Sequence, residues 1–376
     1  MNFELTDEQH DLRRAIRSVL AEECPPTLAR AANEGDVRAD DLWRTMVELD
    51  WPALSLPVEL GGLGMTWVDQ AVLLDELGRA LAPVPYWATV TQFVPAVLEL
   101  GTVVQQERFV VPTAAGSSTG ALAIDEGAGT WSLDGVRAEA VAQGEELVLS
   151  GTKRWVADGA SATEIAVAVR LEGQLRVVVV PGASVSVTPL PPLDGTTRHA
   201  DIGLDGVRLA RDRLLGEGDA GRGLSRAIEA ATLGVAVSMC GTCARILEMT
   251  RDYALAREQF GVPIGSFQAV KHKLADLHLD VQRATALGYF AALCVAEDDP
   301  RRTIAISMAK AAAGDAQRRA FQDGLQLHGG IGYTWEQDLH LFLRRAKVGD
   351  LQFGGASQHR RAVARAAMAG PVGAHK

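Results

Sequence analysis

The sequence QLHGGIGYTWEQDLHLFLRRAKVGDLQFGGASQHR, residues 326–360, decides the fold of this 376-residue chain. Two glycine clusters, residues 329–332 and 354–355, stand on either side of a helical pattern that carries the apolar residues 339–343. Glycine lets a backbone take positive φ and approach a ligand closely. A following helix start offers N–H groups to an anion such as a pyrophosphate. Alone, a GGxG sequence is more often a helix C-cap and an ordinary turn. The rest of the chain is needed to choose between that turn and a ligand site.

Size and charge limit the class of protein. A chain of 376 residues exceeds the usual size of one core, so we expect two or three domains. The net charge of −10 argues against a nucleic-acid binder, which normally has a basic face. The polar N-terminus MNFELTDEQHDLRR is unlike a signal peptide, and no apolar run approaches the roughly 20 residues that span a membrane. We therefore expect a cytoplasmic protein with no nucleic-acid or membrane partner.

The four cysteines, Cys24, Cys240, Cys243 and Cys294, do not form a disulfide framework in a chain of this length. Cys240 and Cys243 have the spacing of metal ligands. They lie, however, in an Ala/Val/Met-rich helical run with no second pair and no nearby histidine. We therefore expect no metal.

Residues 1–115 predict an N-terminal α-helical domain. The capping box Thr6-x-x-Gln9 begins the first helix, and Pro25-Pro26 ends it. Further helical patterns cover residues 42–49, 70–81 and, less clearly, 91–100.

Residues 116–220 predict a middle β-domain. The clearest strands lie in residues 163–181, where Ile165, Val167 and Val169 alternate with smaller residues and a Glu-Gly turn leads into a second apolar run. Many short strands without intervening helices indicate a compact antiparallel barrel or sandwich.

Residues 221–376 predict a C-terminal four-helix bundle. Long helical patterns cover residues 224–258, 267–296 and 301–327, and the stretch quoted first supplies the last helix. Long helices joined by short loops form a bundle. The predicted fold class is therefore α+β and multidomain, with helices, strands and a helix bundle in that order.

This domain order, together with six motifs, resembles the acyl-CoA dehydrogenase family over residues 3–366. The motifs are FELTDEQHDLR at 3–13, DWPALSLPVELGGLG at 50–64, DELGRALAP at 75–83, KRWVADGA at 153–160, REQFGVPIGSFQAVKHKLAD at 257–276 and QLHGGIGYTWE at 326–336. The resemblance implies the family's fold and FAD as the cofactor. It also implies α,β-desaturation of an acyl-CoA thioester, as in lipid β-oxidation, with electron-transfer flavoprotein or a similar electron acceptor.

The resemblance further implies an FAD site that is built across a subunit interface. Carried over by position, the flavin ring lies on the loop that ends at Thr130 and on Trp155. The ADP half belongs to an FAD held mainly by the neighbouring subunit. The residues in position to contact it are Arg257, Gln259, Phe260, Gln326, Gly329 and Gly330. Arginine supplies a fixed fork of donors for a diphosphate; the alternative for Arg257 is a solvated charge at a helix end.

Desaturation needs a base that reaches the α-proton, and the family's base positions have lost that chemistry here. Phe353 occupies the usual glutamate position, and Ala231 occupies the alternative on the first long bundle helix. Thr232 replaces an arginine near the acyl-CoA, and Ala157 replaces a threonine that hydrogen-bonds the flavin near N5. No catalytic residue is therefore assigned to this chain.

The loss of the catalytic positions, with the cofactor-side positions kept, favours a half-site subunit, which completes a cofactor site but supplies no base. This resembles the base-lacking subunit of the α2β2 heterotetrameric acyl-CoA dehydrogenases of actinobacteria. Several of those enzymes serve steroid catabolism. A homologous catalytic subunit would supply the glutamate, and this chain would contribute to FAD binding. The alternative is a self-sufficient homotetrameric or homodimeric flavoenzyme that uses a different base (Glu229, Asp350 or Asp125) or a non-CoA substrate. A third possibility is a purely structural partner without flavin contact.

Overall fold

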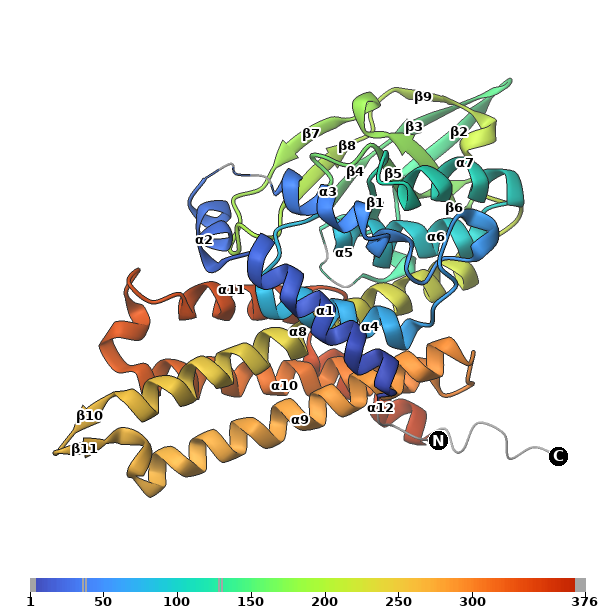
Figure 1. Ribbon diagram of the computed structural model, residues 1–376. Helices are drawn as coiled ribbons and strands as arrows, with labels where there is room; N and C mark the ends of the chain where they lie inside the picture. Colours follow the sequence, from blue (N-terminus) through green and yellow to red (C-terminus); the bar gives the residue numbers. More distant parts are fainter. Residues whose placement is uncertain (1–4, 36, 38, 128, 130, 369–376) are drawn as a thin grey trace. The chain divides into compact units, whose positions relative to one another are not determined.

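The computed structural model describes residues 5–35, 37, 39–127, 129 and 131–368 (Figure 1). The chain forms two compact units, each assembled from separate segments. The first comprises Met1–Val37, Thr66–Pro83 and Thr232–Lys376, and the second comprises Arg38–Met65 and Val84–Ala231. Both units join segments that are distant in sequence, and the three domain boundaries expected from the sequence stay a prediction.

Three helices near the N-terminus belong to the first unit: α1 (Asp7–Glu23), α2 (Pro26–Glu34) and α4 (Trp67–Ala80). The predicted capping box of α1 is confirmed, because the Thr6 hydroxyl accepts from the Gln9 amide N–H and the Gln9 side chain accepts from the Thr6 N–H. Pro26 begins α2 at its first helical position, where a missing N–H costs nothing. The proline pair therefore ends one helix and begins another, which the sequence analysis did not predict.

The long helices follow, and the extents predicted for the first three are confirmed to within a few residues. They are α8 (Gly221–Ala256), α9 (Gln268–Ala296), α10 (Arg302–His328), α11 (Leu339–Leu351) and α12 (Ala356–Met368). Two glycines set the distance between α4 and α8: a Cβ on Gly78 would collide with the Ser238 carbonyl oxygen, and one on Gly241 with that of Asp75. The Thr242 hydroxyl donates to the Gly78 carbonyl oxygen at 2.9 Å across this contact.

The apolar length of α8 corrects one expectation. Among the described residues, α8 alone is long and apolar enough to cross a membrane, whereas no such run was expected from the sequence. Of its most apolar 18-residue window, 78% is buried inside the structure. A buried core helix passes the same test as a membrane span, so this feature is weak support for a span.

The second unit contains the strands and the helices that cover them. Its helical segments are α3 (Asp40–Glu48), α5 (Tyr86–Ala88), a π-helix at Thr89–Phe93, α6 (Val94–Leu100) and α7 (Val103–Ala114). A six-stranded sheet contains β1 (Gly120–Ala123), β2 (Glu139–Gln143), β3 (Glu146–Ser150), β5 (Glu164–Leu171), β6 (Gln174–Pro181) and β9 (Val207–Ala210). A three-stranded sheet contains β4 (Thr152–Ala157), β8 (His199–Gly203) and β7 (Ser186–Pro189) in that order.

Strand β5 lies at the centre of this unit and is buried on both faces. Its Ala166 and Ala168 belong to the core shared with α6 and α7, whereas Val167 and its alternate neighbours belong to the core shared with β4 and β8. The predicted hairpin is confirmed, since β5 and β6 pair in antiparallel register around a turn with Glu172 at φ 51° and Gly173 at φ 80°.

The sheet is not wholly antiparallel, which corrects part of the prediction. Strands β1 and β2 both pair with β5 in parallel. The alternation of apolar residues shows which face of a strand is buried, but it does not show the direction of the neighbouring strand. The combination of a helical part, a central β part and a helix bundle is nevertheless the predicted fold class.

Candidate functional site

The predicted diphosphate-side residues lie beyond two helix ends that are held together. Tyr253, near the end of α8, stacks on His328, the last residue of α10, with ring centroids 4.5 Å apart and planes 19° from parallel. The His328 ring nitrogen Nδ1 forms a hydrogen bond of 2.8 Å with the Gly324 carbonyl oxygen. This buried pair places the loop after Tyr253 and the turn after His328 at one end of the bundle.

The first of these segments is a short hairpin of β10 (Glu258–Gln259) and β11 (Val262–Pro263), seen at the end of α8 in Figure 1. The Arg257 carbonyl oxygen accepts from the Ile264 N–H at 2.8 Å, which closes the hairpin. Phe260 takes φ 57° at its tip with 92% of its side chain exposed. Arg257 and Gln259 are exposed as well, and Arg257 forms no ion pair with any other described residue.

The second segment is the glycine turn Gly329–Tyr333, whose three glycines differ in their surroundings. Gly329 takes φ 64°, a conformation that strains other residues. A Cβ on Gly332 would lie 3.0 Å from the His328 Cβ, so packing favours glycine there. Gly330 has neither constraint, and a Cβ on it would meet no atom within 4 Å. Nothing within the described chain requires glycine at position 330.

These residues fit the diphosphate of an FAD that approaches from outside the bundle. The exposed Arg257 guanidinium is a planar donor without an internal acceptor. The backbone at Gly329 and Gly330 is open to a close approach, and Gln326 is exposed just before it. The roles of these residues stay a prediction.

The second turn of interest follows α11 and contains Phe353, the residue predicted to occupy the family's base position. Phe353 takes φ 53° with only 5% of its side chain exposed, and a bulky residue seldom adopts this conformation. The fully buried Lys310 holds the turn through its Nζ, which donates to the Asp350 carbonyl oxygen at 3.0 Å and to that of Gly354 at 2.9 Å. The His359 Nε2 forms a third bond, of 3.0 Å, with the Phe353 carbonyl oxygen.

Burial has a large effect on the lysine of this turn. It lowers the pKa of Lys310 to about 7, with Lys347 acting in the same direction and the Asp350 carboxylate opposing both. The sequence analysis did not identify Lys310, although a lysine within the Ala-rich run AKAAAG was a signal that could have singled it out. Its role depends on carbonyl groups 40 and 44 residues further along the chain.

Two of the alternative bases, Asp350 and Asp125, accept hydrogen bonds from backbone N–H groups. Asp350 forms an ion pair of 3.0 Å with Lys347 and accepts from the Ala356 N–H at 3.3 Å at the start of α12. Asp125 is buried and accepts three backbone N–H groups, those of Gly127 at 2.6 Å, Gly129 at 3.2 Å and Trp131 at 3.2 Å. The third candidate, Glu229, lies half-buried on α8, two residues before the buried Ala231.

The predicted flavin side lies in the second unit, where Trp155 occupies a bulge. The β4–β8 register shifts between Lys153 and Val156, and Trp155 takes φ 51° with 39% of its side chain exposed. Thr130, the other predicted residue, lies outside the described residues. Ala157, in place of the family's threonine, is buried at the end of β4 and has no hydroxyl to donate.

A buried ion pair, which the sequence analysis also missed, ties the loop after β1 to β4. The Lys153 Nζ is fully buried and donates to the Ile124 carbonyl oxygen at 3.1 Å and to Glu126 Oε1 at 2.6 Å. Glu126 also accepts from the backbone N–H groups of Arg137 and Ala138. Burial lowers the pKa of Lys153, and Glu126 opposes that shift. The loop is therefore fixed beside Trp155 by contacts within its own unit.

Comparisons with known proteins agree with this arrangement. The sequence model of the acyl-CoA dehydrogenase N-terminal domain matches residues 6–117, and that of the C-terminal domain matches residues 221–368. The protein named acyl-CoA dehydrogenase IpdE2 of Mycobacterium tuberculosis is 32% identical over 343 residues, which cover 90% of this chain and 91% of that protein. This chain belongs to the acyl-CoA dehydrogenase family. Members of this family are oxidoreductases that act on CH–CH bonds.

Two further relatives cover nearly the whole chain. The probable acyl-CoA dehydrogenase YngJ of Bacillus subtilis is 28% identical over 97% of this chain and 99% of its own length. Among solved structures, the ChsE4–ChsE5 complex of Mycobacterium tuberculosis contains a chain that matches with a TM-score of 0.90 and 28% identity, over 99% of this chain and 100% of that one. The predicted family and fold are confirmed.

Proposed function

We propose that this chain is the half-site subunit of a heteromeric, FAD-dependent acyl-CoA dehydrogenase. The observation that carries the proposal is Phe353, the residue predicted for the family's base position. It lies buried in a turn where Asp350 forms an ion pair with Lys347 and Lys310 donates to backbone carbonyl oxygens. A phenyl ring accepts no proton, and desaturation requires a group that does.

This chain's contribution would be to binding. In this proposal Arg257 and Gln259 donate to the diphosphate of an FAD held largely by the partner. The backbone at Gly329 and Gly330 approaches the same group. FAD supplies the two-electron oxidation when it is bound, and the partner subunit supplies the glutamate that removes the α-proton. The exposure of all four residues and the open space at both glycines support this role.

The proposed partner is a homologous catalytic acyl-CoA dehydrogenase chain in an α2β2 assembly. The similarity to a chain of the ChsE4–ChsE5 complex supports a heteromeric assembly, because that structure is named as a complex of two proteins. The proposed substrate of the assembly is an acyl-CoA thioester with a fatty or steroid acyl group. The proposed electron acceptor is an electron-transfer flavoprotein or a similar protein.

The decisive experiment compares the chain alone with the chain co-expressed beside a homologous dehydrogenase that carries the glutamate. Native mass and the flavin-to-protein ratio are measured for both preparations. We expect a mixed complex with half a flavin per chain, and acyl-CoA-dependent dye reduction only in that complex. A homotetramer of this chain with one FAD per subunit and full turnover would overturn the proposal. Loss of that turnover in Glu229→Gln would then identify Glu229 as the base of a self-sufficient enzyme.

A further inference from the structure

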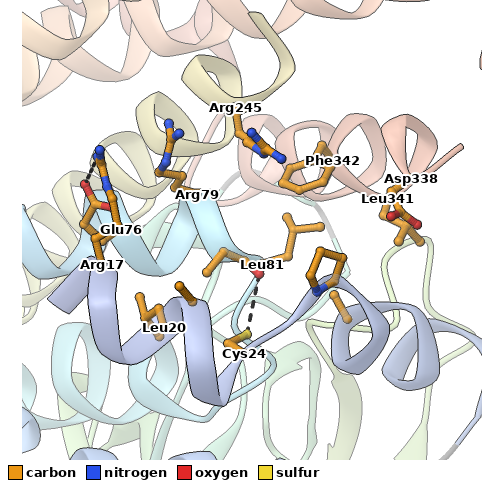
Figure 2. Close-up of a pocket in the computed structure, with 14 residues that line it drawn as sticks. Arg17, Leu20, Cys24, Glu76, Arg79, Leu81, Arg245, Asp338, Leu341 and Phe342 are labelled. Atoms are coloured by element: carbon orange, nitrogen blue, oxygen red, sulfur yellow. Dashed lines mark hydrogen bonds and ion pairs between the residues drawn. The ribbon is translucent and has the colours of Figure 1, made fainter. Parts of the chain in front are cut away.

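A cavity of about 250 Å³ lies within the first compact unit, among α1, α2, α4, α8 and α11 (Figure 2). No residue of the glycine turn or of the Phe353 turn lines it. None of the roles proposed above uses it. Its walls carry three arginines (Arg17, Arg79 and Arg245) and two carboxylates (Glu76 and Asp338), and the other lining side chains are apolar.

Guanidinium groups outnumber carboxylates at the polar end. Arg79 and Arg245 both pair with one carboxylate, that of Glu248, the Arg245 contact being 3.3 Å. Burial raises the pKa of Glu248, but these two arginines outweigh burial and hold the pKa below its usual value. Arg79 and Arg245 therefore have donor groups to spare, because each guanidinium offers five N–H donors.

The other arginines at this end are already bound to carboxylates. Arg17 binds Glu76 through two hydrogen bonds of 2.9 and 2.6 Å. Arg13, which does not line the cavity, lies with its Nε 3.7 Å from Glu76 Oε1 and its Nη2 3.4 Å from Asp75 Oδ2. The donors available to a ligand at this end therefore include those that Arg79 and Arg245 do not use on Glu248.

The rest of the lining is mostly apolar. Figure 2 shows Leu20 below Arg17, Leu81 in the middle, and Leu341 and Phe342 of α11 on the other side, where the Asp338 carboxylate lies beside Leu341. The Cys24 thiol, which also lines the cavity, donates to the Ala80 carbonyl oxygen at 3.6 Å. Burial raises the pKa of Cys24 to about 11, so the thiol stays neutral and behaves as an apolar group.

We propose that this cavity binds a small amphiphilic carboxylate, an unbranched aliphatic acid of about eight carbons. The carboxylate would accept from Arg79 and Arg245, and charge-assisted bonds of this kind are the strong ones. The chain would lie along Leu20, Leu81 and Phe342. Since a cavity of about 150 Å³ holds benzene, one of 250 Å³ holds about ten non-hydrogen atoms, the number in octanoate. A bare inorganic anion would leave the apolar wall uncovered.

The experiment is a calorimetric titration of the folded chain with octanoate, octanol and inorganic phosphate. We expect one saturable octanoate site per chain. We also expect octanol to bind at least about 10-fold more weakly, which corresponds to the loss of one charge-assisted contact. Phosphate should bind at least about 10-fold more weakly as well, because it leaves the apolar wall uncovered. Arg245→Gln should weaken octanoate to the same degree without affecting the fold, because Arg245 is partly exposed.

Two further variants keep the test decisive. Ala21→Trp, at the exposed rim of the cavity, should abolish binding by filling its mouth. Arg318→Gln, on an exposed face of α10 away from the cavity, is the matched control and should bind octanoate as the wild type does. Absence of octanoate binding to the wild type would overturn the proposal. Equal binding of octanol, or unchanged binding in Arg245→Gln and Ala21→Trp, would also overturn it.

Discussion

The glycine turn at residues 329–333 and the Phe353 turn stand before and after the same helix, α11, but their polar groups serve different purposes. At the first turn and its neighbouring hairpin, Arg257 and Gln326 are exposed, and Gly330 is a glycine that the chain itself does not need. At the second turn, the buried Lys310 and the half-buried Asp350 are both committed to nearby groups of the chain.

The difference separates residues that serve a group outside the chain from residues that serve the fold. An exposed arginine with no internal ion pair adds little to stability, since even paired surface charges contribute only about 0–1 kcal/mol. A buried amine, in contrast, must find acceptors or lose its charge. Substitutions at the first turn should therefore change binding and leave stability unchanged, and substitutions at the second turn should do the reverse.

Lys310→Met should have the largest effect. The substitution leaves the Asp350 and Gly354 carbonyl oxygens without their lysine donor, at about 1–3 kcal/mol for each buried group. We expect the free energy of unfolding to fall by about 3 kcal/mol in urea denaturation. Lys271→Met is the control, because that lysine lies exposed on α9 and its loss should cost less than about 1 kcal/mol. Equal losses of unfolding free energy in both variants would contradict the conclusion that Lys310 stabilises the Phe353 turn.

The pH dependence of stability should come next in size. The pKa of Lys310 is about 7 in the folded chain, against an ordinary value of 10.5. Between these values the unfolded chain binds more protons. The contribution to stability that is linked to Lys310 is therefore fully present above pH 10.5. It is lost as pH falls towards 7, by up to about 1.4 kcal/mol per pH unit. The difference in unfolding free energy between wild type and Lys310→Met should grow from pH 7 to pH 9. If this difference in unfolding free energy stayed constant with pH, the pKa of Lys310 would not be lowered in the folded chain.

Arg257→Ala should separate binding from stability. The unfolding free energy should change by no more than about 0.5 kcal/mol, because the side chain is exposed and has no internal ion pair. FAD affinity of the mixed complex should fall by about 10- to 100-fold, which is the loss of a charge-assisted bond worth about 1.5–3 kcal/mol. Flavin fluorescence on dilution measures the affinity, with Arg318→Ala as the control. Unchanged flavin content in Arg257→Ala would favour the purely structural partner.

Much of the fold was readable from the sequence because its long helices are regular. The extents of α8, α9 and α10 follow from apolar residues at helical spacing. The pattern was weaker at residues 91–100, where the π-helix Thr89–Phe93 buries Thr91 and Gln92 and shifts the helical face. Strand direction beside β5 was not readable, since alternation is the same for parallel and antiparallel neighbours.

The two turns differed in how much the sequence predicted. The motifs indicated Arg257 and Gly329 because they are adjacent in the chain to recognisable neighbours. The two bonds from Lys310 that hold the Phe353 turn join residues 40 and 44 positions apart, so no local pattern contains them. Lys153 and Glu126 are 27 residues apart and were missed for the same reason.

Two adjacent glycines offer a smaller, internal test of the first turn. Gly329→Ala should lower the unfolding free energy by about 1 kcal/mol, because alanine is strained at φ 64°. Gly330→Ala should leave stability within about 0.5 kcal/mol, since its Cβ meets open space. Both should weaken FAD in the mixed complex if the backbone lies against the diphosphate. Normal flavin affinity in Gly330→Ala would show that no ligand approaches that position.

The smallest expected effect is on turnover by Phe353→Glu in the chain alone. A carboxylate at this position would restore one group that is predicted to be lost. Thr232 and Ala157 are predicted to lack two others, near the acyl-CoA and near flavin N5. Phe353→Gln is the matched control, since glutamine has nearly the shape of glutamate but cannot act as a base. We expect both variants to show no acyl-CoA-dependent dye reduction. Turnover in the Glu variant alone would mean that the missing base is the only barrier, and that this chain binds acyl-CoA productively by itself.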